Sequence, residues 1–305
     1  MRREAKAPIP SYETGSTSVA GAPAGVRPAR RDRSATTYVC PDCKTQLAEL
    51  RCPDCAHQYR LSHGFPALLS NDPRYHAARQ VADAYDSIYA HHKNLWGSDE
   101  RSREFIRYFA GLLGGFPARR VLEVGCGEGA LLAALPAGER YGTDISIRAL
   151  ERAHAAAPAA LCTCLGERLP FSDGFFDVVA SVGVMEHFLD DHAASAEICR
   201  VLRDGGRYVA LVHLHLTPWQ ALRQKISEYV FPRPRPLLLA RWLFGKFYEP
   251  IREPVQNRYT IEDARTCLER SGLAVTDVIH TGNAPAAPLI GPHVIIYVCQ
   301  KPAER

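Results

Sequence analysis

The chain has 305 residues, of which 46% are hydrophobic and 23% charged. These values are ordinary for a globular protein and exclude collagen-like, wholly disordered and coiled-coil proteins. The net charge of +4 comes entirely from the first 33 residues, where seven basic side chains outnumber three acidic ones. Because the rest of the chain is neutral overall, its charge does not favour a nucleic-acid-binding protein.

The first 35 residues mix Pro, Gly, Ala, Ser and Arg without apolar periodicity, which predicts a disordered basic tail. An RNA-binding arm is the alternative interpretation of this segment. No stretch reaches the ~20 apolar residues that span a bilayer, and the N-terminus lacks the apolar core of a secretory signal. We therefore expect a soluble, cytoplasmic protein.

Four of the ten cysteines form two Cys-x-x-Cys pairs, Cys40 with Cys43 and Cys52 with Cys55. Each pair can direct two thiolates at one point, and two such pairs complete a tetrahedral zinc site. Disulfides are not expected in a reducing compartment, and a redox motif would need only one pair. Because the protein fills all four positions, we expect a structural Zn²⁺ in a zinc ribbon over residues 36–72.

The sequence around these cysteines ends in Gly64-Phe65-Pro66 and a short apolar run. In this it resembles the small zinc-ribbon proteins that activate tRNA, rRNA and release-factor methyltransferases in trans. The resemblance implies that the ribbon can bind a protein partner. Between residues 77 and 113, apolar and aromatic side chains then recur at helical spacing, which predicts two helices that cover one face of the following domain.

A glycine turn follows these helices. A buried strand over residues 121–124 leads into Gly125-Cys126-Gly127-Glu128-Gly129, and a helix is expected over residues 130–135. This order opens a doubly wound, nucleotide-binding sheet. A pyrophosphate prefers backbone N–H groups without a nearby anion, but Glu123 and Glu128 stand beside the glycines. S-adenosylmethionine (SAM) carries an ammonium and a sulfonium group, so these carboxylates favour SAM over NAD.

Three ordered segments, VLEVGCGEGALL, YGTDIS and GERLPFSDGFFDVVASVGVMEHF, resemble the class I SAM-dependent methyltransferases and, among them, the ubiquinone-biosynthesis-like group. The resemblance implies a doubly wound α/β fold with a seven-stranded, mostly parallel sheet over residues 73–305. It also implies that the turn glycines let the backbone approach the cofactor, that Glu123 supports its amino-acid end and that Asp144 holds the ribose. The glycines concerned are Gly125, Gly127 and Gly129.

One position departs from this family's pattern. The family usually has an aspartate that accepts the adenine amino group, and this chain has Leu165 there. Adenine is then left to Gly166, Glu167 or backbone groups. Ser181, near the end of the fourth expected strand, completes the expected cofactor-binding set.

Further along the chain, the pattern predicts a helix over residues 190–202 that Gly205-Gly206 ends, and an alternating strand over residues 207–216. A capped helix is expected over residues 260–271, and strands near residues 273–281 and 293–300, the last antiparallel. Residues 217–259 form an insertion with eight basic and three acidic side chains and interleaved aromatic residues. It can be a lid, an interfacial helix centred on residues 237–247 that contacts a membrane, an RNA-stacking surface or an ordinary amphipathic cap.

Methyl transfer requires an aligned donor and acceptor and, for some acceptors, a general base. His187, just after the fourth expected strand, is the first candidate, although a loop histidine bonded to the backbone is equally typical of this position. His213, near the end of the fifth strand, is the second. No Asn/Asp-Pro-Pro-Tyr motif of amine methylation follows residues 180–181.

These observations predict a SAM-dependent methyltransferase that acts on an oxygen or carbon of a small molecule such as a secondary metabolite, glycan or lipid precursor. An rRNA or tRNA base methyltransferase and a non-catalytic SAM-binding scaffold protein are the alternatives.

Overall fold

The computed structural model describes residues 38–91, 100–136, 138–214, 254–280 and 294–303, which belong to one structural unit spanning residues 34–305. The predicted basic tail and nearly all of the 217–259 insertion lie outside these residues. No helix in the described ranges is both long and apolar enough to cross a membrane.

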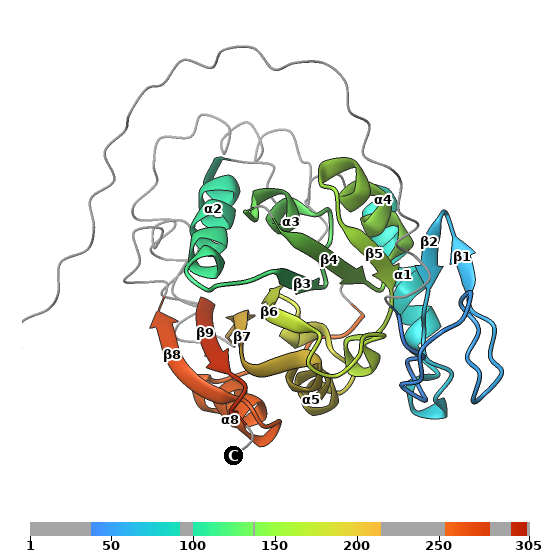
Figure 1. The fold of residues 1–305 in the computed structure, drawn as a ribbon. Helices are drawn as coiled ribbons and strands as arrows, with labels where there is room; N and C mark the ends of the chain where they lie inside the picture. Colours follow the sequence, from blue (N-terminus) through green and yellow to red (C-terminus); the bar gives the residue numbers. More distant parts are fainter. Residues whose placement is uncertain (1–37, 92–99, 137, 215–253, 281–293, 304–305) are drawn as a thin grey trace, which may run out of the picture. The chain divides into compact units, whose positions relative to one another are not determined.

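A sheet of nine strands forms the centre of the described structure, in the order β1-β2-β5-β4-β3-β6-β7-β9-β8 (Figure 1). Neighbouring strands from β2 to β7 are parallel, whereas β9 is antiparallel to both β7 and β8. Strands β3 to β9 therefore form the predicted doubly wound sheet, and the prediction is confirmed. The bounds of its strands are β3 (Arg120–Val124), β4 (Glu139–Asp144), β5 (Ala160–Thr163), β6 (Phe176–Val182), β7 (Leu202–His213), β8 (Ala274–His280) and β9 (Val294–Gln300).

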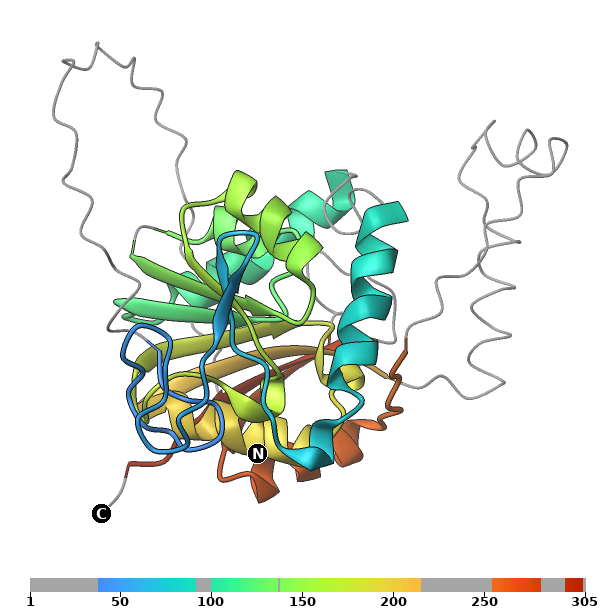
Figure 2. The same cartoon turned by 90° about the vertical axis from the view of Figure 1, so that its right-hand side faces the viewer.

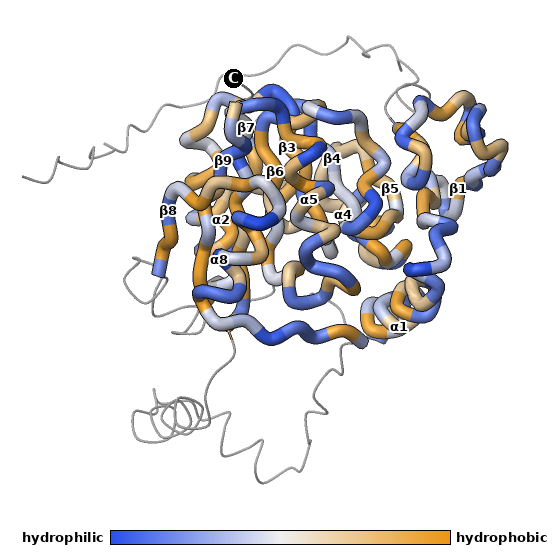
Figure 3. The backbone as a smooth tube through the Cα atoms, turned by 90° about the horizontal axis from the view of Figure 1, so that it is seen from below, coloured by the Kyte–Doolittle hydropathy of each residue, from blue (hydrophilic) through white to orange (hydrophobic). Residues whose placement is uncertain are grey.

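Helices cover both faces of this sheet, as alternation along the strands requires. On β6, Val178 and Ala180 pack with α2, α3 and α4, whereas Val179 between them packs with α5 and α8. Figure 3 shows that hydrophobic residues concentrate in these central strands. The helices are α1 (Ala78–His91), α2 (Glu100–Gly114), α3 (Ala130–Ala134), α4 (Ile147–Ala156), α5 (Asp191–Val201) and α8 (Ile261–Arg270), with short 3₁₀ helices η1 (Pro73–Tyr75), η2 (Gly166–Arg168) and η3 (Met185–His187).

The glycine pair Gly205-Gly206 does not have its predicted role. Helix α5 already ends at Val201, and β7 begins at Leu202, so both glycines lie inside a strand that was expected to start at residue 207. Pairing between β6 and β7 shifts register at this point. Gly205 has a φ of +72°, a backbone conformation that favours glycine and is typical of a bulge. The two glycines thus permit a bulge inside the strand. In the sequence, this bulge has the same glycine signal as a helix end.

The cysteine-rich segment continues into the sheet. Its hairpin, β1 (Arg60–Ser62) and β2 (Phe65–Ala67), is antiparallel, and β2 pairs with β5 through Ala67 and Thr163. Residues 38–72, called the ribbon below, also share the apolar core on the α5 side of the sheet, where Tyr38 lies 5.7 Å from Phe171 between ring centroids. The ribbon is therefore an extra edge of the sheet.

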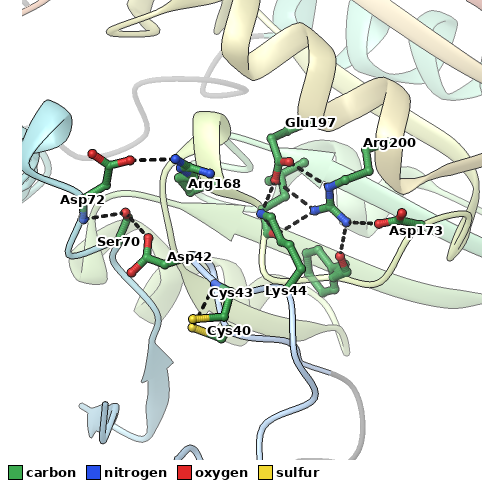
Figure 4. A network of polar contacts seen from close by, with 12 residues as sticks. Cys40, Asp42, Cys43, Lys44, Ser70, Asp72, Arg168, Asp173, Glu197 and Arg200 are labelled. Atoms are coloured by element: carbon green, nitrogen blue, oxygen red, sulfur yellow. Dashed lines mark hydrogen bonds and ion pairs between the residues drawn. The ribbon is translucent and has the colours of Figure 1, made fainter. Parts of the chain in front are cut away.

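Charged side chains reinforce this junction (Figure 4). Lys44 of the ribbon forms an ion pair with Glu197 of α5 at 2.6 Å, and Glu197 also binds Arg200. Burial lowers the pKa of Lys44, although Glu197 opposes that shift. At the other end of the ribbon, Asp72 binds Arg168 of η2 at 2.6 Å. The ribbon is thus held against α5 through Lys44 and against η2 through Asp72.

Candidate active site and metal centre

A cavity of about 370 Å³ lies where β3, β4, β5 and β6 end. Parallel strands of a doubly wound sheet present their carboxyl ends on one edge, and ligands bind there. Helix α1 crosses this edge (Figure 2) and contributes Val81, Tyr85 and Tyr89 to the lining, and α2 contributes Phe105 and Ile106. Of the predicted site residues, the cavity brings together Glu123, Gly125, Gly127, Asp144, Gly166, Glu167, His187 and His213.

The glycine turn predicted after the first strand of the domain is present after β3. Gly125, Gly127 and Gly129 all have positive φ angles, of 66°, 50° and 78°. A Cβ atom on Gly125 would lie 2.6 Å from Cγ2 of Val184, and one on Gly129 would lie 2.8 Å from Cα of Ala153. Only glycine satisfies both requirements. Gly129 itself is not part of the cavity lining and instead allows α3 and α4 to pack closely.

Asp144 ends β4 and closes the turn from the other side. Its Oδ2 accepts a hydrogen bond from the backbone N–H of Gly127 at 2.9 Å, and its Oδ1 accepts one from Ser146 at 2.9 Å. Burial raises the pKa of Asp144 to about 6, although these hydrogen bonds oppose the shift. Each oxygen of a carboxylate accepts more than one hydrogen bond, so Asp144 retains capacity for ligand hydroxyl groups.

The lining of the cavity is rich in carboxyl groups. Its described lining contains four carboxyl groups, those of Glu123, Glu128, Asp144 and Glu167, and no lysine or arginine. Glu123 is 4% exposed, and its Oε2 has no hydrogen-bond partner among the described residues. Burial raises the pKa of Glu123 well above its usual range. A buried carboxyl group with an unsatisfied oxygen fits a cationic ligand group and does not fit a phosphate.

The segment after β5 provides a flat, mostly apolar part of the lining. Leu165 is buried, and a Cβ on Gly166 would lie 2.9 Å from Cδ1 of Phe188, so only glycine fits against that ring. Only part of the hydrogen-bonding capacity of Glu167 is left for a ligand, because its Oε1 accepts hydrogen bonds from the backbone N–H groups of Leu189 at 2.6 Å and Asp190 at 3.1 Å. Its first role is to hold the loop that follows η3, and burial raises its pKa.

The two candidate histidines differ in their partners. Nδ1 of His187 lies 2.8 Å from the backbone oxygen of Val255, to which a protonated Nδ1 donates. Nδ1 of His213 instead binds Oε1 of Glu186, a residue of η3 that the sequence did not single out. Ser181 is fully buried, and its hydroxyl lies 2.8 Å from that of Tyr208. The described lining does not include Ser181.

Sequence reasoning missed the part of α1 in this site. Tyr85 and Tyr89 were placed on a helix that covers the domain, and their i, i+4 spacing was a signal for one shared face. In the structure, both tyrosines line the cavity. The Tyr89 hydroxyl would lie 3.0 Å from a Cβ atom placed on Gly127. Asp86 of α1 accepts hydrogen bonds from Ser146 and Arg148 at the start of α4, which holds the helix there.

The four ribbon cysteines form a second candidate site. Their sulfur atoms all lie within 4.8 Å of one another, and those of Cys40 and Cys55 are 3.9 Å apart. Tetrahedral coordination with Zn–S bonds of about 2.3 Å requires sulfur atoms about 3.8 Å apart. In each pair, the N–H of the second cysteine, Cys43 or Cys55, donates to the first sulfur, Cys40 or Cys52, at 3.5 Å. This arrangement suits four thiolates around one metal ion.

The sheet with its antiparallel strand β9, the glycine turn and the surrounding carboxylates define a class I SAM-dependent methyltransferase. Residues 122–210 match the family described as a methyltransferase domain. The ubiquinone/menaquinone biosynthesis C-methyltransferase UbiE of Burkholderia mallei (strain SAVP1) is 30% identical over 176 residues, which cover 52% of this chain and 68% of that protein. UbiE of Burkholderia pseudomallei (strain 668) matches with the same values.

Two solved structures share the fold. The [4+2]-cyclase SpnF has a TM-score of 0.50 and 17% identity, covering 74% of this chain and 97% of its own. The protein PH0226 of Pyrococcus horikoshii OT3 has a TM-score of 0.50 and 16% identity, covering 70% and 98%. These likenesses show the fold, and the sequence matches confirm the predicted enzyme class. The chain belongs to the UbiE-like family of SAM-dependent methyltransferases.

Proposed function

We propose that this methyltransferase transfers a methyl group from SAM to an oxygen or carbon atom of a small, largely apolar acceptor. The observation that carries the proposal is the set of carboxyl groups in the cavity, whose described lining contains four of them and no lysine or arginine. Such a lining favours a cationic cofactor and gives no described counter-charge to an acceptor phosphate or carboxylate.

In this proposal, the residues around the turn hold SAM, which supplies an electrophilic methyl group when bound. The unsatisfied oxygen of Glu123 takes the ammonium group, and Asp144 accepts the ribose hydroxyls. The absence of a side chain at Gly125 and Gly127 lets the backbone approach the ligand. Adenine lies along Leu165 and Gly166, where the apolar lining replaces the usual aspartate contact.

The rest of the cavity accommodates the acceptor. Apolar side chains dominate this part of the lining, which also contains His187 and His213; the apolar residues are Phe105, Ile106, Val182, Val184 and Leu211. An apolar surface beside histidines suits a neutral acceptor that loses a proton from an O–H or activated C–H group. The Burkholderia relatives are named as C-methyltransferases of ubiquinone and menaquinone biosynthesis, which agrees with such a carbon acceptor.

Transfer of labelled methyl groups tests this proposal. The purified full-length chain is incubated with [methyl-³H]SAM and an extract from a host that lacks the enzyme, and the extract is then fractionated. We expect label in the small-molecule fraction, and none with Asp144→Ala. Label in RNA would instead support the rRNA or tRNA methyltransferase. Binding of S-adenosylhomocysteine without label in any fraction would support the non-catalytic scaffold.

We further propose that the cysteine cluster binds one structural Zn²⁺, so that residues 36–72 form a zinc ribbon ahead of the methyltransferase domain over residues 73–305. Four protein thiolates leave no coordination position for a catalytic water. Ten cysteines without a disulfide among the described residues agree with a cytoplasmic location. Metal analysis should find one zinc ion per chain, and the double variant Cys43→Ser, Cys55→Ser should contain none.

A protein partner that binds through the ribbon also remains part of this proposal. Because β2 and Lys44 already contact the chain's own β5 and α5, such a partner would bind the remaining surface of the ribbon.

A further inference from the structure

A buried carboxyl group lies behind one of the two cavity histidines. Glu186 is 4% exposed and lies in η3, and its Oε1 is bound to Nδ1 of His213 at the end of β7. Its second oxygen, Oε2, is buried without a hydrogen-bond partner among the described residues. The imidazole lines the cavity, and its side chain is 34% exposed. A proton acceptor at the ligand is thus backed by a carboxyl group that faces away from solvent.

The cost of burying Glu186 indicates what the pair does. An ionised carboxyl group in an apolar surrounding is destabilising unless a cation compensates it. In the described part of the chain, His213 is the ionisable side chain bonded to Glu186, so the carboxyl group is placed to stabilise the imidazolium that forms when this ring takes a proton. Gly183 has a φ of +63°, and a Cβ there would lie 2.9 Å from Cε1 of His213. A larger residue at this position would therefore displace the ring.

The two cavity histidines bind different groups. His187 binds a backbone carbonyl oxygen, that of Val255, which orients its ring. A carboxylate also orients a ring, and in addition it stabilises the imidazolium that forms when the ring takes a proton. The contact with Glu186 therefore gives His213 both features of a general base, an oriented ring and a stabilised imidazolium.

We propose that His213 is the general base of methyl transfer and that Glu186 is its positioning residue. This inference rests on the methyl transfer proposed above. Because Nδ1–H donates to Glu186, the neutral ring carries its lone pair on Nε2. Nε2 takes the acceptor proton, and the electron pair of the broken O–H or C–H bond forms the new bond to the methyl carbon. SAM supplies that methyl group, and its sulfur keeps the electron pair of the broken S–C bond. His213 afterwards releases the proton to solvent.

Rates of methyl transfer test the base. The full-length chain receives [methyl-³H]SAM at saturation and, as acceptor, the small-molecule fraction of the extract. His213→Ala should lower the rate by about 10²–10⁴-fold, with an unchanged KM for SAM, and added imidazole should restore part of it. Glu186→Gln should lower the rate at least about tenfold, again without a change in KM. His187→Ala is the matched control, and added imidazole should not restore its rate.

A spectroscopic measurement tests the pair without an acceptor. In the ¹⁵N-histidine NMR spectrum of the chain bound to S-adenosylhomocysteine, the signal missing from His213→Ala identifies this ring. We expect the Nδ1–H tautomer in the wild type and a mixture of tautomers in Glu186→Gln. An Nε2–H tautomer in the wild type would overturn the inference. This readout does not depend on the proposed function, because it needs no methyl acceptor. Full transfer by His213→Ala would overturn the inference while leaving the proposed function intact.

Discussion

Replacing Glu123 by glutamine keeps the shape of the side chain and removes its charge. In the proposed function, the buried, unsatisfied Oε2 of Glu123 binds the ammonium group of the cofactor. A hydrogen bond to a charged group contributes about 1.5–3 kcal/mol. Glu123→Gln should therefore weaken the binding of S-adenosylhomocysteine, which keeps this ammonium group, about 10- to 150-fold by isothermal titration calorimetry.

The same substitution should stabilise the protein without ligand. Burial raises the pKa of Glu123, so its contribution to folding is fully present below the pKa of the unfolded chain and is lost as the pH rises through the folded pKa. Glutamine does not titrate. The melting temperature of Glu123→Gln should therefore exceed that of the wild type at pH 8, and the difference should vanish near pH 4.

Glu128→Gln is the matched control. Glu128 lines the same cavity, but it forms an ion pair with Arg152, and its side chain is 11% exposed. Because Arg152 already compensates its charge, its loss should change affinity for S-adenosylhomocysteine by no more than about fivefold, the equivalent of about 1 kcal/mol. Unchanged affinity in Glu123→Gln, or an equal loss in both variants, would refute the assignment of the ammonium site.

Three further outcomes are expected. Burial raises the pKa of Asp144 to about 6, and ribose hydroxyls donate best to the ionised carboxylate, so affinity for S-adenosylhomocysteine should fall as the pH drops below 6. Asp144→Asn should bind S-adenosylhomocysteine weakly and without this pH dependence. If the pH dependence persists in the variant, Asp144 is not its source. Gly129→Ala should destabilise the fold by about 2–4 kcal/mol in urea titration, because its Cβ would contact Ala153 at positive φ, whereas Gly111→Ala, with open space in α2, should be neutral or stabilising. Removal of metal by a chelator should lower both the melting temperature and the affinity for S-adenosylhomocysteine, because β2 of the ribbon pairs with β5 beside the cavity. An unchanged melting temperature would contradict a structural role of the metal.

Local spacing encodes the features that sequence reasoning predicted correctly. The turn from Gly125 to Gly129 needs positive φ angles at fixed positions, and the four cysteines need two tight loops, so both patterns are visible within a few residues. The same kind of evidence failed at Gly205-Gly206, because a glycine pair is equally compatible with a helix end and with a bulge inside a strand.

The family, the sheet and the position of carboxyl groups beside the glycine turn were therefore open to prediction from the amino-acid sequence. The partnership of Glu186 with His213, the face of α1 that covers the cavity and the attachment of the ribbon to β5 were not. These contacts join residues that are far apart along the chain, and they depend on the order of the strands and on their register. Periodicity reports which side of a strand or helix is apolar, but folding of the whole sheet decides which residue of another element lies opposite it.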